Sequence, residues 1–159
     1  EILIIETNPE IEKRKKILPQ EKNLELISNS NFFLCMPDTF FYGQKPYELL
    51  NQNPDVADVA CWKIRGEQKG KLGQVEQSEN YITDIKDKSK DCDYEYSWGA
   101  FTFSRKLEEF IDNKDPHVGY ALEKAVNNKL KISYKNIDGE YFDCGTPEEY
   151  LSLLTKLIT

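Results

Sequence analysis

Two aspartates in the sequence follow apolar runs and precede turns. Asp38 follows FFLCMP, and Asp143 stands in YFDCG near the other end of the chain. If both runs are strands of one sheet, both carboxylates reach its carboxyl-terminal edge, where open α/β sheets bind ligands. Two carboxylates there can share a hard cation, since Mg²⁺ is typically bound by one or two carboxylates together with substrate phosphates. Each aspartate also has a purely structural interpretation: Asp38 could cap a turn through Thr39, and Asp143 could satisfy backbone groups beside Gly145.

The element expected to position Asp38 is the longest near-continuous apolar run of the chain, NFFLCMPDTFFY, from Asn31 to Tyr42. Phe32 to Met36 predict a strand that is buried on both faces. Pro37 cannot donate to a strand ladder, so the strand is expected to end there and to leave Asp38 at its carboxyl end. The stretch that follows, Phe40 to Gln44, is expected to be a loop.

Hydrophobic periodicity predicts the remaining elements. Further strands are expected at Glu1–Thr7, Val56–Ile64, Tyr96–Phe103 and Lys131–Ile137, with a hairpin that joins Leu72–Glu76 to Tyr81–Ile85. Helices are expected between Pro9 and Pro19, at Lys45–Asn51, Leu107–Ile111 and Val118–Asn127, and from Pro147 onward with Thr146 as N-cap. The last helix is expected to bury a stripe of Leu151, Leu154 and Ile158, and Gly99 predicts a bulge or a close backbone approach inside its strand. Strands that alternate with helices favour an α/β sandwich with a mixed sheet.

Composition limits the classes of function. The 159 residues suit one domain, and the formal net charge of −7 argues against a protein that grips nucleic acid. No run approaches the roughly 18 apolar residues that a membrane span needs. The four cysteines have no metal-ligand spacing, which indicates free thiols and a cytoplasmic protein. The chain starts within an apolar strand without Met, so we expect the domain to be incomplete at its N-terminus.

Five motifs occur in a fixed order along the chain. They are PDT (Pro37–Thr39), LGQV (Leu72–Val75), IKDK (Ile85–Lys88), YSWGAF (Tyr96–Phe101) and GEYFDCGTPEEY (Gly139–Tyr150). In this order they resemble the motifs of the sugar-1-phosphate nucleotidyltransferases, the nucleotide-sugar pyrophosphorylases of the glucose-1-phosphate thymidylyltransferase kind. The last motif, similar to the family's G-x-y-x-D-x-G-T-p-e-x-y, is the most specific of the five.

The resemblance implies a fold and a metal site. The fold would be a Rossmann-like three-layer sandwich with a mixed, mostly parallel sheet, formed as one nucleotidyltransferase-like domain over residues 1–159. Asp38 and Asp143 would hold Mg²⁺ on the phosphates of a nucleoside triphosphate. A sugar-1-phosphate oxygen would attack the α-phosphorus in line and expel pyrophosphate, a reaction that needs mainly positioning and charge neutralisation.

The resemblance also implies a sugar site. Lys88, at the position of the family's E-K-P lysine, would be the catalytic residue that contacts the sugar phosphate. Asp87 would bind sugar hydroxyls, and Gly99 would line the sugar pocket with its backbone. Trp98 is interpreted as a core or pocket-wall residue that could stack on the sugar. The partners implied are a nucleoside triphosphate and a sugar 1-phosphate, with no nucleic acid and no membrane, and a homo-oligomer remains open.

Departures from the family pattern keep other functions open. The glycine-rich start G-G-x-G-T-R-L, which cradles the triphosphate, is absent from this sequence, so the chain by itself is expected to be inactive. Asp87 replaces a glutamate and Ser89 a proline. One alternative is a non-catalytic sugar-nucleotide-binding or regulatory domain. Another is a metal-dependent glycosyltransferase, although the D-x-D of Asp91 to Asp93 lies in an expected linker. His117 is expected to have a capping or loop role.

Overall fold

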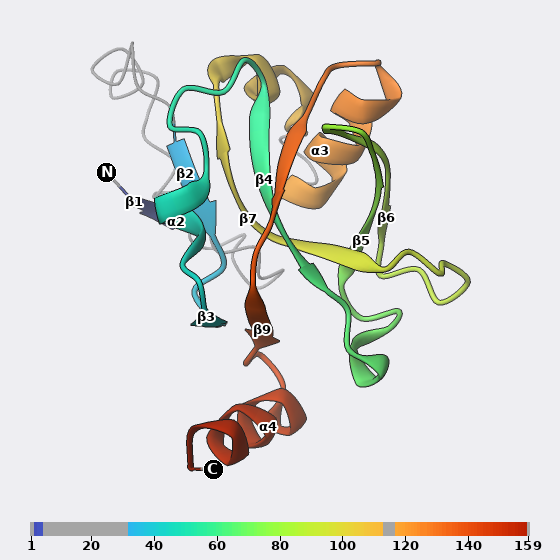
Figure 1. Ribbon diagram of the computed structural model, residues 1–159. Helices are drawn as coiled ribbons and strands as arrows, with labels where there is room; N and C mark the ends of the chain where they lie inside the picture. Colours follow the sequence, from blue (N-terminus) through green and yellow to red (C-terminus); the bar gives the residue numbers. More distant parts are fainter. Residues whose placement is uncertain (1, 5–31, 113–116, 159) are drawn as a thin grey trace.

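The computed structural model describes residues 2–4, 32–112 and 117–158 (Figure 1). Seven of the described strands form one sheet in the order β1-β2-β7-β4-β8-β6-β5. They are β1 (Ile2–Ile4), β2 (Phe32–Cys35), β4 (Ala57–Lys63), β5 (Gly73–Ser78), β6 (Tyr81–Asp87), β7 (Tyr96–Phe103) and β8 (Ser133–Asn136). The two other described strands, β3 (Thr39–Gly43) and β9 (Gly139–Asp143), pair with each other in a separate antiparallel ribbon.

The pairing of neighbouring strands confirms a mixed sheet but not a mostly parallel one. Within the described residues only β1 with β2 and β4 with β8 pair in parallel. Strand β7 lies between β2 and β4 and is antiparallel to both. Strand β5 pairs antiparallel with both β6 and β7, so the sheet is partly closed. The prediction of a mostly parallel sheet is therefore wrong for the pairings: β6 and β7 run against the other described strands, so β7 is antiparallel to β2, β4 and β5, and β6 is antiparallel to β5 and β8.

The centre of the sheet consists of β4 and β7, and both predictions for these strands are confirmed. Their side chains are buried on both faces, as expected for central strands covered on both sides. The register between them shifts: Ala60 pairs with Ala100, whereas Cys61 pairs with Trp98. Gly99 is the extra residue of this bulge, as the sequence predicts.

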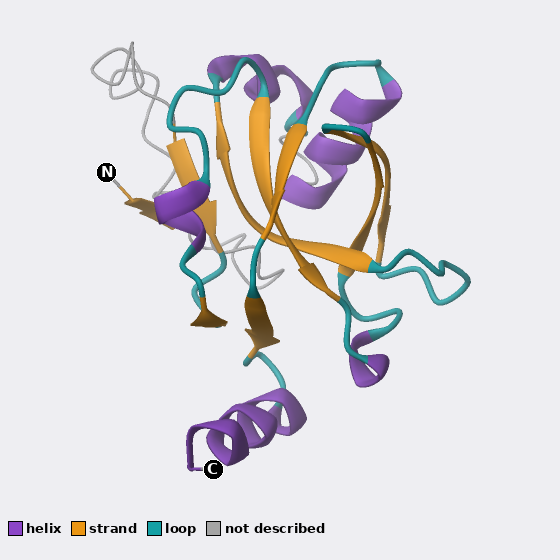
Figure 2. Cartoon of the chain, in the orientation of Figure 1, coloured by secondary structure: helices purple, strands orange, loops and turns teal. Residues whose placement is uncertain are grey.

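Helix α3 (Val118–Asn127) and the 3₁₀ helix η3 (Arg105–Phe110) cover one face of the sheet (Figure 2). Helix α3 has the predicted bounds and buries Leu122 and Ala125 in the larger of two apolar clusters. The 3₁₀ helix η3 begins after Ser104, whose hydroxyl accepts a hydrogen bond from the Lys106 N–H. Helix α2 (Pro46–Leu49) is shorter than predicted. The predicted helix between Pro9 and Pro19 lies outside the described residues.

The β3–β9 ribbon packs on the other face and overturns the predicted loop at Phe40–Gln44. Phe41 stacks on Trp62 with ring centroids 5.1 Å apart, and Tyr141 of β9 packs against both rings. Thr39 pairs with Asp143 at one end of the ribbon, and Gly43 pairs with Gly139 at the other. The strand forms because its pairing partner comes from a distant part of the chain, a contact that local patterns do not reveal.

Helix α4 (Pro147–Ile158) begins as predicted but buries a different face. The Glu149 N–H donates to the hydroxyl of Thr146 over 3.3 Å, which confirms the N-cap. Leu151 and Ile158 of the predicted stripe are 60% and 84% exposed, whereas Leu153 is 5% exposed. The predicted apolar stripe is therefore wrong, because α4 buries Glu149 and Leu153 instead.

Two further features of the described residues bear on the predictions. All four cysteines are free thiols, as the sequence predicts. None of the helices in the described part of the chain is long and apolar enough to cross a membrane.

Candidate functional site

Backbone pairing brings Asp38 and Asp143 together at one end of the ribbon. Asp143 is the last residue of β9 and pairs with Thr39, the first residue of β3. The Cys144 N–H donates to the Asp38 carbonyl oxygen over 2.7 Å. Two aspartates that are about a hundred residues apart in the sequence thus become neighbours through the strand pairing. The sequence predicted this juxtaposition, and the structure shows it.

The two carboxylates converge on Gly145. A Cβ atom placed on this glycine would lie 2.7 Å from Asp38 Oδ2 and 3.1 Å from Asp143 Oδ1. The two oxygens are therefore less than about 6 Å apart, close enough to share one hard cation with only small side-chain adjustment. Gly145 also donates its N–H to Asp143 Oδ1 over 3.3 Å, so the local backbone contact considered for Asp143 is present as well.

The charges around the pair suit a cation. Burial raises the pKa of Asp143, and the Asp38 carboxylate raises it further, while the Gly145 N–H and the Lys88 ammonium lower it. The two carboxylates repel each other, and Gly145 between them has no side chain to fill the space. Mg²⁺ prefers oxygen ligands of this kind. Within the described ranges, no group of three or more His, Cys, Asp and Glu side chains could hold a metal. The pair would therefore need water or phosphate oxygens to complete the coordination of an ion.

Lys88 follows β6, and its ammonium charge lowers the pKa of Asp143. Its side chain is exposed, and its backbone has a φ of 49°, in the left-handed region that residues other than glycine rarely adopt. The Lys88 N–H donates to the Leu72 carbonyl oxygen over 3.1 Å, which fixes this conformation at the start of β5. Lys88 therefore combines a left-handed backbone with an ammonium group whose charge acts on Asp143.

Asp87, next to Lys88, lies in a different cluster with Trp98 and His117. The Asp87 side chain is 6% exposed, and its Oδ2 lies 3.6 Å from His117 Nε2. Trp98 is 7% exposed and packs against Phe101 and against the Cα atoms of two glycines, Gly73 and Gly119. Trp98 Nε1 and His117 Nδ1 are buried and have no hydrogen-bond partner among the residues that the structure describes. The indole N–H faces Gly73, so the backbone of β5 covers it.

Gly99 lies on the opposite side of β7 from the Trp98 indole. A Cβ on Gly99 would clash with the ring of Tyr141 and would lie 3.0 Å from Trp62. The Tyr141 hydroxyl lies 3.3 Å from the hydroxyl of Thr39, the residue after Asp38. Gly99 therefore lets β9 approach the sheet beside the aspartate pair. The structure brings Asp38 and Asp143 together, and the charge of Lys88 lowers the pKa of Asp143. It places Asp87 and Trp98 in a separate cluster with His117.

Comparison with known proteins gives matches in structure but not in sequence. No family model matches the chain, and no curated protein matches its sequence. UDP-glucose pyrophosphorylase complexed with UDP-glucose superimposes with a TM-score of 0.64 at 18% identity, covering 86% of this chain and 59% of that one. Inositol-1-phosphate CTP transferase from T. maritima gives a TM-score of 0.66 at 17% identity, covering 99% and 74%. The chain has a sugar-1-phosphate nucleotidyltransferase-like fold.

A third structure with this nucleotidyltransferase-like fold is a putative glucose-1-phosphate thymidylyltransferase from Bacillus anthracis in complex with sucrose. It gives a TM-score of 0.64 at 18% identity, over 83% of this chain and 56% of that one. The chain spans less than two thirds of the length of this structure and of the UDP-glucose pyrophosphorylase. The resemblance inferred from the five sequence motifs is thus confirmed by the fold.

The sequence did not indicate the contacts of three residues near the candidate site. His117 was expected in a capping or loop role, and it is the N-cap residue of α3, although its side chain makes no capping hydrogen bond. Its ring lies instead against Asp87, a contact that the sequence did not indicate. Arg65 and Gln68 were not considered, although both donate hydrogen bonds to the backbone of β9 at Tyr141. No local signal marks them, because a charged residue and an amide next to a glycine in a loop are usually solvated.

Proposed function

We propose that the protein transfers a nucleotidyl group from a nucleoside triphosphate to a sugar 1-phosphate, with release of pyrophosphate. The observation that carries this proposal is the convergence of the Asp38 and Asp143 carboxylates on Gly145 in a nucleotidyltransferase-like fold. Structures of similar fold include enzymes whose names specify a UDP-sugar, a glucose 1-phosphate and an inositol 1-phosphate. Because these neighbours share less than a fifth of their sequence with this chain, they support the reaction class and not a particular sugar or base.

Asp38 and Asp143 are the residues that would hold Mg²⁺ in this proposal. When bound, the ion would neutralise charge on the phosphates and orient them for in-line displacement. The two aspartates would provide a fixed pair of anionic oxygens on rigid backbone, and their mutual repulsion favours binding of a cation. The exposure of Asp38 and Gly145 leaves the pair open to a phosphate ligand.

Lys88 would contact the sugar phosphate and stabilise the negative charge that develops during transfer. Its exposed side chain and its influence on Asp143 support this role. Gly99 would line the sugar pocket, and Asp87 would bind sugar hydroxyls with Trp98 as part of the wall. The burial of Asp87 and Trp98 means that only their edges could reach a ligand. A cytoplasmic location and a homo-oligomer remain predictions.

The experiment that tests the proposal measures pyrophosphate release by the full-length protein. A panel of nucleoside triphosphates is combined with a panel of sugar 1-phosphates in the presence of Mg²⁺. We expect release with one preferred pair, its loss on removal of the metal with a chelator, and its loss in Asp38→Asn and Asp143→Asn. Release that persists in both variants would contradict the proposal.

A second function, from a different class, is a sugar-nucleotide-binding or regulatory domain without turnover. The observation that favours it is the absence of the glycine-rich triphosphate motif from these 159 residues. Calorimetric titration with nucleotide-sugars distinguishes the two. Binding of a nucleotide-sugar by a full-length protein that releases no pyrophosphate with any substrate pair would establish the binding domain in place of the enzyme.

A further inference from the structure

Arg65 and Gln68 donate hydrogen bonds to the same two acceptors. Arg65 reaches the Tyr141 carbonyl oxygen over 2.9 Å and Glu149 Oε2 over 2.7 Å. Gln68 Nε2 reaches the same carbonyl over 2.9 Å and the same carboxylate oxygen over 3.2 Å. One acceptor belongs to β9 and the other to the first turn of α4. The four residues thus form a clamp that ties a strand and a helix to the loop after β4.

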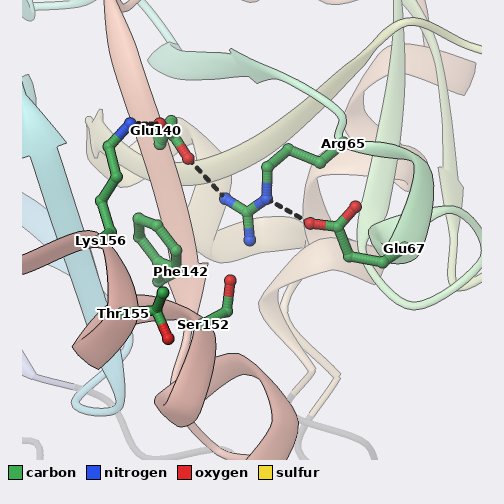
Figure 3. A pocket seen from close by; sticks show the side chains of 7 residues that line it. All are labelled: Arg65, Glu67, Glu140, Phe142, Ser152, Thr155 and Lys156. Atoms are coloured by element: carbon green, nitrogen blue, oxygen red, sulfur yellow. Dashed lines mark hydrogen bonds and ion pairs between the residues drawn. The ribbon is translucent and has the colours of Figure 1, made fainter. Parts of the chain in front are cut away.

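Local contacts that do not involve the acceptors also hold the donors of this clamp in place. Both lie around the 3₁₀ helix η2 (Gly66–Gln68), where the Arg65 N–H donates to Gln68 Oε1 over 3.2 Å and the Gln68 N–H donates to the Arg65 carbonyl over 3.0 Å. The guanidinium lies 4.3 Å from the centre of the Phe142 ring. Figure 3 shows it between Glu67 and Glu140, which it contacts at 2.7 Å and 3.5 Å.

The clamp is largely buried. Gln68 is 3% and Glu149 6% exposed, and the Arg65 side chain is 20% exposed. Burying an ion pair removes much of its net contribution to stability, because both ions lose hydration. A satisfied network of this kind nevertheless enforces one geometry, because any other arrangement leaves a buried charge or amide unpaired. Its main effect is therefore to fix where β9 and α4 lie.

The two anchor points of the clamp flank Asp143 along the chain. Tyr141 lies two residues before Asp143, and Glu149 lies in the helical turn that follows it. Between them the chain makes the turn through Gly145, and the Glu149 N–H closes this turn on the hydroxyl of Thr146. Both ends of the segment that carries Asp143 are thus tied to the loop after β4.

We infer that Arg65 and Gln68 are positioning residues for the aspartate pair, acting through Tyr141 and Glu149. This inference rests on the proposed function, since it assumes that the pair binds a divalent cation. Among the described residues, no hydrogen bond or ion pair joins the clamp to either carboxylate of the pair, so Arg65 and Gln68 act on the pair through the positions of Tyr141 and Glu149. The charge of Glu149 also raises the pKa of Asp143. Outer residues that orient metal ligands typically change metal affinity by about 10- to 100-fold when they are replaced.

The test is a titration of the full 159-residue chain with Mn²⁺ alone, followed by electron paramagnetic resonance as a probe of the Mg²⁺ site. The decisive variant is Gln68→Met, which removes two hydrogen bonds of the clamp without changing any charge. We expect the Mn²⁺ affinity to fall about 10-fold. Arg65→Lys keeps the charge but cannot reach both acceptors as a fork, so it should give a similar loss and serves where Gln68→Met does not fold.

The matched control for this test is Thr102→Val. The Thr102 hydroxyl is buried and donates to the Asn51 carbonyl oxygen over 2.6 Å, far from the clamp in the sequence. The substitution removes this hydrogen bond without changing the charge or the size of the side chain, so it should lower the thermal unfolding midpoint. It should leave the Mn²⁺ affinity unchanged. General loosening of the fold would lower affinity in the control as well, and this outcome would overturn the positioning role.

The outcomes separate the inference from the proposed function. Asp143→Asn should abolish the Mn²⁺ signal. If it does, and the Gln68 and Arg65 variants bind Mn²⁺ as the unmodified chain does, the clamp has no positioning role and the metal site stands. If Asp143→Asn binds Mn²⁺ like the unmodified chain, or the unmodified chain does not bind it, the metal site of the proposed function is contradicted and the positioning role fails with it.

Discussion

The carboxylates of Asp38 and Asp143 meet over the Cα atom of Gly145, where a Cβ would lie 2.7 Å from one oxygen and 3.1 Å from the other. Gly145→Ala should therefore push the two carboxylates apart and lower Mn²⁺ affinity by about 10-fold or more. The measurement is the Mn²⁺ titration described for the clamp.

Gly66→Ala is the matched control for Gly145→Ala, because no atom lies within 4 Å of the position that its Cβ would take. Because Gly145 is exposed, we expect the free energy of unfolding of both alanine variants to lie within about 0.5 kcal/mol of that of the unmodified chain. Equal Mn²⁺ affinity in Gly145→Ala and Gly66→Ala would show that no cation is bound between the two aspartates.

The parts of the fold that the sequence predicted correctly are those that local patterns determine. Apolar runs identified β4 and β7, and Gly99 marked the bulge between them. Helix α3 was predicted because its apolar residues recur at helical spacing. Asp38 and Asp143 stood out because each follows an apolar run and precedes residues that favour turns. Their meeting was expected at one edge of a common sheet, but in the structure it comes about through the separate β3–β9 ribbon. Their assignment to Mg²⁺ followed from the family resemblance.

The parts that the sequence did not predict depend on contacts between distant residues. Strand β3 forms because β9 pairs with it, and Thr39 and Tyr141, whose hydroxyls meet, are 102 residues apart. The buried face of α4 follows from Glu149, whose ion pair with Arg65 joins residues 84 positions apart. A glutamate in the first turn of a helix is usually solvated, so hydrophobicity alone selected Leu151 for the core instead.

Lys88 combines an exposed charge near Asp143 with a φ of 49°. Replacing Lys88 by alanine in the full-length protein should lower turnover by about 10²- to 10³-fold, the usual cost of losing one stabilising group at a reacting phosphate. Lys88→Gly should lose the same turnover but unfold at a higher temperature than Lys88→Ala, because glycine adopts this φ without strain.

The Lys88 prediction is checked by pyrophosphate release together with thermal unfolding of the two variants. A turnover that falls in Lys88→Ala but recovers in Lys88→Gly would mean that the backbone conformation, and not the ammonium group, is what the site needs. Turnover that is unchanged in both variants would remove Lys88 from the proposed site.

Gly99 provides a test of how closely the ribbon packs on the sheet. A Cβ at this position would clash with the buried ring of Tyr141 and would lie 2.5 Å from its Cδ2. Gly99→Ala should lower the free energy of unfolding by about 1 to 3 kcal/mol, the usual cost of overpacking a core. Chemical denaturation measures this loss, with Gly66→Ala as the control.

Because Tyr141 lies beside Thr39 at the aspartate pair, Gly99→Ala should also disturb Mn²⁺ binding. A variant with Gly99→Ala and Tyr141→Ala makes room for the new methyl group and should not be less stable than Tyr141→Ala alone. If the double variant is instead less stable by the full cost of Gly99→Ala, the contact between these two residues is not the cause of the loss.

A pH-dependent contribution to stability is expected from Asp84 and Tyr94. The Tyr94 hydroxyl donates to Asp84 Oδ2 over 2.7 Å, and the Lys86 ammonium lies 3.2 Å from the same oxygen. Burial raises the pKa of Asp84, but hydrogen bonds from Tyr94, Lys86 and the Ile85 N–H outweigh it and leave the pKa below its ordinary value. The bond to Asp84, with burial, raises the pKa of Tyr94 to about 12.

Because the pKa of Asp84 is lower in the folded chain than in the unfolded chain, its contribution to stability is present above the ordinary aspartate pKa of about 4 and is lost as the pH falls through the folded value. Tyr94→Phe removes the hydroxyl donor, so it should lower the thermal midpoint at pH 7 relative to the unmodified chain. The difference between the two should shrink as the pH falls below about 4. Tyr150→Phe, at an exposed position on α4, is the control and should show no difference at either pH. A difference for Tyr94→Phe that is equally large at acid pH would mean that the carboxylate of Asp84 is not the partner that stabilises the fold.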